Sequence, residues 1–481
     1  MVNKANTLAP RFSMSKRAPV TPSPGPLEIY CQAFDELLSK RSQRDSFRRY
    51  LEGLLLPTER NKTMTGLANT EPIVGAQHPQ AQRLQWFLSE STWDPDMVNR
   101  RRLELLSSET APNGDGVLAI DETGDRKWGT KTAHVGRQYL GSIGKVDNGV
   151  VSVSSLWADE RTYYPIEVEP YTPASWFERG KSDLEFQTKP EIALKLVRDA
   201  LELDIPFRAV VADSFYGEHR GFRGELDRLD IGYVLALKPS HCWWHMEGEL
   251  GCVEEVALAH AWDEDAPGEW VKLTRTFRDG HTEVWWVLEG EAGPYGVNKA
   301  RRLVIVTTDP KGLPEQTTWY LVTNLPAPER ASKLVPANLA EVVRLYGLRV
   351  WVEQSYKQVK QTLGWAQYQV RSSVAIQRHW QLVFCAFSFC WWASRRTQRK
   401  ALGAEAVPRS VGVEEMGTMP AVMPAVMPAV MEESEKKGAP STELACCVEK
   451  GEGMAGAILY AYALLASVVG QAPARAIANT A

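Results

Sequence analysis

Three features that would place a protein in a familiar class are missing from this sequence. None of its seven cysteines stands in the C-x2-C spacing of a zinc site, so structural zinc is not expected. No signal-peptide pattern opens the chain, which predicts reduced thiols and a cytoplasmic protein. The 55 basic and 59 acidic residues give a net charge of -4, so total charge does not indicate a nucleic-acid partner.

Long hydrophobic runs are also absent. The nearest approach is the uncharged segment 453–474, whose apolar part, 454–469, is rich in alanine and shorter than the roughly 18 residues of a membrane span. We interpret this segment as a buried or docking helix in preference to a membrane helix. No membrane partner is therefore predicted.

Charge is unevenly distributed along the chain. Residues 341–400 contain ten Lys and Arg against two acidic residues, whereas residues 244–291 contain three basic against twelve acidic residues. This asymmetry is typical of a protein that binds a polyanion with one surface and keeps other surfaces repulsive. A length of 481 residues allows two or three domains.

Changes in composition divide the chain into segments. Residues 1–26 are rich in Pro, Ser and basic residues without apolar periodicity, which predicts a disordered leader. Amphipathic spacing and repeated arginines over 27–110 predict an all-helical domain, which either binds DNA or is a bundle with a solvated basic face. Residues 401–481 are interpreted as a low-complexity linker and C-terminal tail. The Met-Pro-Ala-Val repeat that starts at Met419 excludes a helix there, because a proline recurs every fourth residue.

The middle of the chain alternates between strand and helix patterns, which indicates an α/β domain. The apolar runs 117–120 and 209–212 predict buried strands, and an aspartate follows each of them, Asp121 and Asp213. An Asp-Asn-Gly triplet at 147–149 predicts a hairpin turn.

Residues 240–325 change to a period-two, aromatic pattern that predicts a β-rich insertion. Four of its tryptophans either pack within that sheet or stack on a base that is extruded from a DNA end: Trp243, Trp244, Trp285 and Trp286.

A single helix is predicted between Glu341 and Gly364, because proline is absent and apolar residues recur every three or four positions. At about 100° per residue, one face of this helix presents a phenol, a carboxylate and three cations. These residues are Tyr346, Arg349, Glu353, Lys357 and Lys360. Such an excess of positive charge on one face favours phosphate as the ligand.

Asp121, Asp213 and Glu353 form a D, D, E triad. Three acids that converge from separate elements are the smallest set that holds two Mg2+ ions for phosphodiester chemistry, with Mn2+ as the expected substitute. Each acid alone could instead be structural, as a helix cap, a turn residue or an ion-pair partner within its helix. Glu122 and Asp125 are the nearest competitors in the first motif, and strand alternation points Glu122 away from Asp121.

The motifs resemble one known family. Four residues of the predicted helix reproduce the spacing Y-x2-R-x3-E-x6-K: Tyr346, Arg349, Glu353 and Lys360. The segments Ile-Asp-Glu-Thr-Gly around Asp121 and Ala-Asp-Ser-Phe-Tyr-Gly around Asp213 precede it in the order of that family's first two motifs. Together they resemble the Y-R-E-K group of bacterial insertion-sequence DDE transposases, over about residues 26–396.

The resemblance implies an α/β fold of the ribonuclease-H-like type, with a mixed sheet. Residues 111–239 and 326–400 would form the catalytic domain, residues 240–325 its β-rich insertion, and residues 27–110 a helical domain that recognises transposon ends. Catalysis and metal binding would fall to Asp121, Asp213 and Glu353.

The resemblance also implies ligands and partners. Tyr346, Arg349 and Lys360 would bind the phosphates of the transposon end, with Lys357 as a weaker candidate outside the signature. The partners would be double-stranded DNA, as transposon ends and as target, and a second copy of the chain in the end-paired complex, in a nucleoid-associated cytoplasmic protein. Two alternatives remain: a catalytically silent DNA-binding regulator, and a carboxylate-dependent glycosidase suggested by the 17 tryptophans and many acids.

Overall fold

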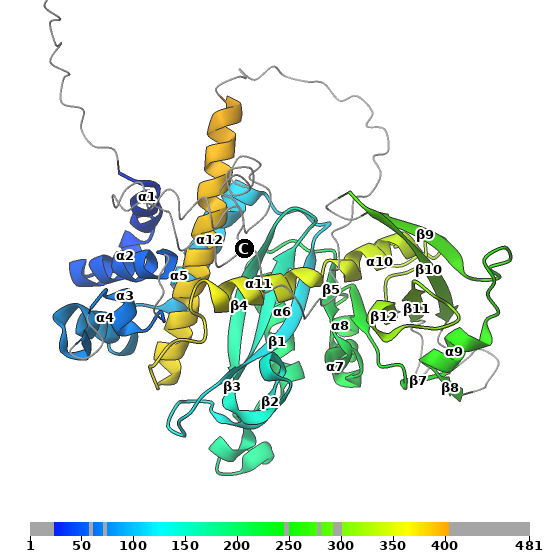
Figure 1. Ribbon diagram of the computed structural model, residues 1–481, viewed down its shortest axis with the longest axis horizontal. Coiled ribbons are helices and arrows are strands. Elements are labelled where there is room, and N and C mark those ends of the chain that lie inside the picture. Colours follow the sequence, from blue (N-terminus) through cyan, green and yellow to red (C-terminus); the bar gives the residue numbers. More distant parts are fainter. Residues whose placement is uncertain are drawn as a thin grey trace, which may run out of the picture.

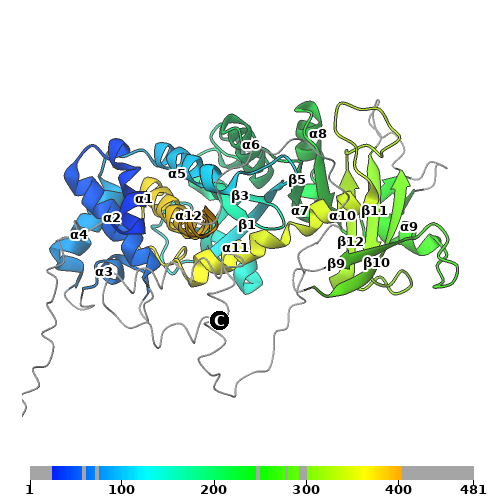
Figure 2. The ribbon, with the colours of Figure 1, turned by 90° about the horizontal axis from the view of Figure 1, so that it is seen from above.

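The computed structural model describes residues 24–56, 61–70, 75–244, 250–276, 280–291 and 301–403. The predicted leader up to residue 23, the repeat that starts at Met419 and the segment 454–469 lie outside these ranges. Figures 1 and 2 show an elongated arrangement, with helices at one end, a sheet through the middle and antiparallel strands at the other end.

Five described α-helices precede the first strand. They are α1 (Pro26–Gln32), α2 (Arg41–Leu55), α3 (Met64–Leu67), α4 (Pro79–Ser89) and α5 (Pro95–Thr110). Proline at the first turn starts α1, α4 and α5, where its missing N–H costs no hydrogen bond. Helices α1, α2, α4 and α5 pack around α12 (Ser373–Gly403), which passes beside α2 and α5 in both views, and α3 packs on α2 and α4. Every residue from 379 to 394 is buried, so α12 is the shared core of the helical region.

A buried histidine joins this helical region to the loop after α11 (Val350–Gln361). His379 Nε2 lies 3.2 Å from the carbonyl oxygens of both Gly364 and Trp365, and its Nδ1 lies 2.7 Å from the Tyr50 hydroxyl. Because carbonyls only accept, Nε2 bears the proton and Nδ1 accepts from Tyr50. Burial lowers the pKa of His379 to about 4, which keeps the ring neutral.

Ten strands form one mixed sheet. They are β1 (Val117–Arg126), β2 (Gly136–Leu140), β3 (Lys145–Ala158), β4 (Tyr163–Tyr171), β5 (Ala209–Ala212), β6 (Tyr233–Ala236), β9 (Val271–Thr276), β10 (Thr282–Glu291), β11 (Arg302–Thr307) and β12 (Thr318–Thr323). The order is β2-β3-β1-β5-β6-β12-β11-β10-β9, with β4 paired to β3. β1, β5 and β6 run parallel, and the other pairings are antiparallel. The predicted mixed α/β class is confirmed.

The strands of the β-rich segment extend the central sheet. β12 pairs with β6 from Leu321 opposite Ala236 to Thr323 opposite Val234, and β11, β10 and β9 follow outward. A separate two-stranded sheet, β7 (Cys242–Trp244) with β8 (Leu250–Cys252), and helix α9 (Val253–Ala259) precede β9 in the chain. The main-chain hydrogen bonds therefore continue without interruption from the central parallel strands to β9.

The expected turn at 147–149 is wrong. β3 runs through these residues, with Asn148 opposite Arg137 and Gly149 opposite both Gly136 and Arg126. The hairpin turns instead at 141–144, where Gly144 adopts the left-handed conformation at φ 63°. The Asn148 side chain donates to the carbonyl oxygens of Lys127 and Gly129, which holds this part of β3 in the sheet.

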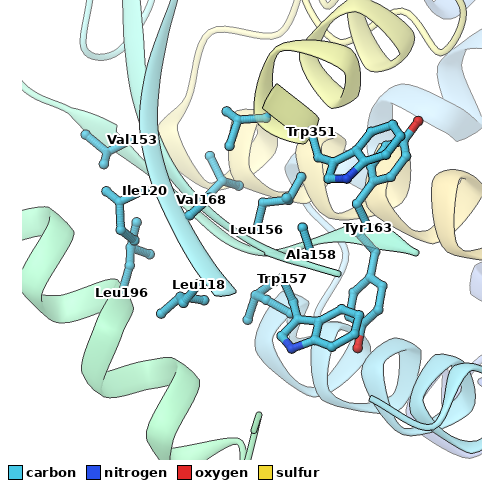
Figure 3. Close-up of a cluster of buried hydrophobic side chains, with 14 of the residues drawn as sticks. Leu118, Ile120, Val153, Leu156, Trp157, Ala158, Tyr163, Val168, Leu196 and Trp351 are labelled. Carbon is cyan, nitrogen blue, oxygen red and sulfur yellow. The ribbon is translucent and has the colours of Figure 1, made fainter. Parts of the chain in front are cut away.

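Helices cover both faces of the central strands. Leu118 and Ile120 of β1 pack against Leu196 of α6 (Lys189–Glu202) (Figure 3). On the opposite face, Trp351 of α11 stacks on Tyr163 of β4, with ring centroids 4.4 Å apart (Figure 3). The remaining helices are α7 (Ser214–Gly217), α8 (Arg220–Arg228) and α10 (Leu339–Gly347). No helix in the described ranges is both long and apolar enough to span a membrane.

Replacing Tyr50 with phenylalanine should destabilise the fold. The change leaves the buried Nδ1 of His379 without its donor, which costs about 1 to 3 kcal/mol. Urea unfolding measures the difference, and Tyr139→Phe is the matched control, since the Tyr139 side chain is exposed. Equal unfolding free energies for the two variants would show that the Tyr50 to His379 bond contributes nothing.

Candidate active site

Two aspartates lie at one edge of the parallel strands. β1 and β5 pair in register up to Ile120 opposite Ala212, so Asp121 and Asp213 are the next residues on neighbouring strands. β5 ends there, whereas β1 continues to Arg126, which corrects the expectation that both aspartates close their strands. Parallel strands deliver the residues that follow them to one edge, and this brings the two carboxylates together.

Each aspartate is held by a local hydrogen bond. Asp213 caps α7, where its Oδ1 accepts from the backbone N–H of Phe215 at 3.0 Å. Asp121 is buried, and its Oδ1 accepts from the N–H of Glu122 at 2.7 Å. Burial raises the pKa of Asp121 to about 6, against the opposing effect of the Arg349 cation, and the charge of Asp213 adds to the rise.

The expected single helix over 341–364 is two helices. α10 ends at Gly347, and α11 begins at Val350. Between them the N–H of Arg349 donates to Tyr346 O at 3.0 Å, the tighter three-residue spacing of a 3-10 turn. The chain keeps its direction through this turn, as α10 and α11 show in Figure 1.

Arg349 lies between the acids. Its Nη2 is 2.9 Å from Asp121 Oδ2, and its Nη1 is 3.7 Å from Glu353 Oε1. Burial disfavours the charged guanidinium, but the negative charges of Asp121, Asp213 and Glu353 outweigh it and hold the pKa of Arg349 above its ordinary value. All three acids of the triad therefore act on one partly buried cation.

The other three predicted residues, Lys360, Lys357 and Tyr346, have different surroundings. Lys360 Nζ lies 2.8 Å from Asp125 Oδ1, and Asp125 is only 5% exposed. The side chain of Lys357 is exposed to solvent. Tyr346 packs its ring edge against Trp319 at 5.1 Å, and burial raises the pKa of its phenol. Tyr346 lies in α10 and the three cations lie at or within α11, and of these cations only Arg349 and Lys360 reach β1.

Glu353 is the most open member of the triad. Its side chain is 67% exposed, on the same helix edge as Arg349. Within the described residues, no three or more His, Cys, Asp or Glu side chains are gathered closely enough to hold a metal ion. Like charges repel at short range, and Arg349 takes the position between Asp121 and Glu353. The donor set itself, three carboxylates without nitrogen or sulfur, is the set that Mg2+ prefers.

The two residues that hold the backbone of Asp121 in place, Tyr356 and Ser154, were not predicted from the sequence. The Tyr356 hydroxyl donates to the carbonyl oxygen of Asp121 at 3.1 Å and lies 2.7 Å from Ser154 Oγ. Tyr356 was within reach of prediction, because it follows Glu353 by three residues on the same helix. Ser154 was not, because its position opposite Asp121 depends on the β1 to β3 register.

Lys189 and Tyr216, which bind Glu122 on the α6 side of the sheet, were also not predicted from the sequence. Glu122 accepts from Lys189 Nζ at 2.6 Å and from the Tyr216 hydroxyl at 3.2 Å. This agrees with the prediction that Glu122 faces away from Asp121.

The aromatic pair of β10 favours the packing alternative. Trp285 and Trp286 are both buried, and Trp285 packs on Trp319 and against the guanidinium of Arg275. The side chains of Trp243 and Trp244 lie outside the described residues.

Comparisons with known proteins identify the family of the chain. Residues 33–250 match the family described as DDE superfamily endonuclease. The chain is 33% identical over 358 residues, 74% of its length, to 85% of the probable transposase for insertion sequence element IS701 from Microchaete diplosiphon. A solved structure of the piggyBac transposase synaptic complex with hairpin DNA aligns with a TM-score of 0.40 and 12% identity, over 80% of this chain and 77% of the other.

The class of protein is thus that of the transposases, with the match to the DDE superfamily endonucleases over residues 33–250. Within that class, the chain belongs to the insertion-sequence transposases.

Replacing Lys360 with methionine should destabilise the fold by about 3 kcal/mol, because it leaves the buried carboxylate of Asp125 without its cation. Lys357→Met is the control on the same helix edge, and it should change the unfolding free energy by less than about 0.5 kcal/mol. Adding Asp125→Asn to Lys360→Met should restore part of the loss. Equal effects of the two lysine substitutions in urea unfolding would contradict the buried pair.

Proposed function

We propose that this transposase works by cut-and-paste chemistry with Asp121, Asp213 and Glu353 as its catalytic metal ligands, and that it belongs to the Y-R-E-K group. The main support is that all three acids act on Arg349: Asp121 lies on β1, Asp213 follows the neighbouring parallel strand β5, and Glu353 lies one helical turn from the arginine. The remaining layout is proposed with it: a ribonuclease-H-like catalytic domain over 111–239 and 326–400, and end recognition by 27–110.

The metal would be Mg2+, as two ions, with Mn2+ as a substitute. Asp121 and Asp213 would hold both ions, and Glu353 would complete the second site. When bound, such ions stabilise the attacking and leaving oxygens of a phosphodiester. The Tyr356 hydroxyl, which also contacts Ser154, donates to the carbonyl oxygen of Asp121 and so fixes the backbone of this ligand. Glu353 is exposed and is able to move towards a ligand.

Arg349 and Lys360 are the proposed phosphate ligands at the transposon end, with Tyr346 beside them and Lys357 as the weaker candidate. Both cations are neutralised by acids of β1, Arg349 by Asp121 and Lys360 by Asp125. A phosphate bound here would compete with Asp121 and Asp125 for the two cations, which both lie beside β1. Arginine suits this role because it binds phosphate through two parallel N–H donors.

The reaction takes place in two displacements. Water attacks phosphorus at the transposon end, the bond to the 3'-oxygen breaks, and a 3'-hydroxyl is released. That hydroxyl then attacks a phosphodiester of target DNA and displaces the target's 3'-oxygen, so the number of phosphodiester bonds is conserved in the second step. Pairing two ends requires two protomers, so the working complex is a homodimer on double-stranded DNA.

Replacing any one of Asp121, Asp213 and Glu353 with alanine should abolish Mg2+-dependent nicking of a labelled transposon-end duplex. Each change removes a metal ligand and leaves the apolar core intact. Gel-shift affinity for the same duplex should stay within about threefold of the parent. Glu202→Ala, at an exposed acid of α6, is the control and should nick normally. Near-normal nicking by any triad variant would remove that residue from the site. A protein that binds ends but never nicks would indicate the regulator, and absence of both activities would reopen the glycosidase alternative.

Metal affinity should depend on pH in a defined direction. The pKa of Asp121 is raised to about 6, so below pH 6 a metal must displace a proton from this carboxyl group. The apparent Mn2+ affinity should rise about tenfold per pH unit below 6 and level off above 7. Calorimetric Mn2+ titration of the DNA-free protein at pH 5, 6, 7 and 8 measures this. An affinity that is flat from pH 5 to 7 would exclude Asp121 as a ligand.

A further inference from the structure

The chain segment 126–148 forms an exposed surface that the proposed chemistry does not use. It contains the loop between β1 and β2, strand β2 and the first residues of β3, below α11 in Figure 1. Its exposed cations and aromatic rings define what we term the hairpin surface: Arg126, Trp128, Lys131, Arg137, Tyr139 and Lys145. The whole segment contains five Lys and Arg residues and one acid, Asp147.

Most of this positive charge is not neutralised within the structure. Arg126 pairs with Asp147 at 3.1 Å. Lys131, Arg137 and Lys145 form no ion pair or side-chain hydrogen bond with any other described residue. The N–H of Asn148 and then the three cations Arg126, Lys145 and Arg137 lower the pKa of Asp147, so this single acid is ionised and still outnumbered. A net positive surface of this kind attracts a polyanion.

Exposed rings accompany the cations. Trp128 is 85% exposed, and the guanidinium of Arg126 stacks on it with 4.0 Å from Cζ to the ring centroid. Tyr139 is 58% exposed and lies opposite Val146, which is also exposed. A soluble protein gains nothing in stability from such rings in water, whereas cations interleaved with aromatic rings are typical of surfaces that bind nucleic acid.

The strand register places two residues of the hairpin surface, Arg137 and Tyr139, on the active-site face of the sheet. On β3, Ser154 lies opposite Asp121, Asn148 opposite Arg137 and Val146 opposite Tyr139. These β3 residues differ by even numbers, so their side chains and those of their partners share one face. Lys145 and Arg126 are an odd number of residues from Ser154 and Asp121, so they lie on the opposite face of the same hairpin. From Ser154 to Val146, eight residues at about 3.3 Å each span roughly 26 Å. At about 3.4 Å per nucleotide, this corresponds to about seven or eight base pairs from the acids.

We propose that the hairpin surface binds the phosphate backbone of double-stranded DNA about seven or eight base pairs from the phosphodiester that is cleaved or attacked. This inference rests on the proposed function, since it takes Asp121 as the site of chemistry. The bound duplex is either the transposon end or the target, which share the same phosphate chemistry. Arg137 would bind a phosphate on the active-site face, and Lys145 and the Arg126–Trp128 pair would contact the backbone from the opposite face of the hairpin.

The test uses the full chain with Arg137→Glu and Lys145→Glu combined. The matched control is Arg228→Glu with Lys333→Glu, two side chains that are 70% and 82% exposed and lie near the start of β6, at the opposite end of the parallel strands from Asp213. Both double variants change the net charge equally. Fluorescence anisotropy in EDTA, where no metal-dependent chemistry occurs, gives affinity for a transposon-end duplex and for an unrelated duplex across a salt series.

The hairpin variant should bind at least one duplex about 10-fold to 100-fold more weakly, and the slope of log affinity against log salt should fall by about two, one for each phosphate that the variant no longer binds. The control should remain within about threefold of the parent, and both variants should melt at the parent temperature. Weaker binding confined to the end duplex or to the unrelated duplex identifies which DNA is bound, and either result supports the proposal.

Equal weakening in the hairpin variant and the control would overturn the proposal, because it would report total charge only. Unchanged affinity and salt slope for both duplexes would overturn it as well. Because these measurements are made in EDTA, they are independent of nicking. A parent protein that fails to nick but shows hairpin-dependent binding would therefore contradict the proposed chemistry and leave the surface in place.

Discussion

The parallel pairing of β1 with β5 is the constraint on which the rest of the structure depends. It fixes Asp121 and Asp213 as neighbours at one edge of the sheet. On its other side, β1 pairs with β3, and that register decides that Ser154 supports Asp121 and that Arg137 and Tyr139 continue the same face. A shift of one residue in either pairing would turn every one of these side chains to the opposite face.

The carboxylates of Asp121 and Asp125 on β1 are buried and need positive counter-charges, and α11 supplies them. Arg349 neutralises Asp121 and Lys360 neutralises Asp125, so the two ends of α11 are fastened to one strand. The stacking of Trp351 on Tyr163 holds the first turn of the helix against β4. The same cations are the proposed phosphate ligands, so stability without DNA and affinity for DNA depend on the same charges.

The helical region and the central sheet are joined through α12. Its buried segment packs against α2 and α5, and Arg102 of α5 donates to the carbonyl oxygens of Pro165 and Ile166 in β4. End recognition by 27–110 and chemistry at the sheet are therefore proposed for parts that share one core. Movement of one part relative to the other would have to break these buried hydrogen bonds.

The sequence by itself determined the strands, the helices and the residue types at the site, because apolar periodicity and the spacing of Tyr346, Arg349, Glu353 and Lys360 are local properties of the chain. Only the tertiary structure decided the break between α10 and α11, the run of β3 through 147–149, and the pairing of Lys360 with Asp125. These outcomes depend on strand register and on which charge lies opposite which. Pairings such as that of Lys360 with Asp125 join residues far apart in the chain, and such distant pairs leave no local pattern in the sequence.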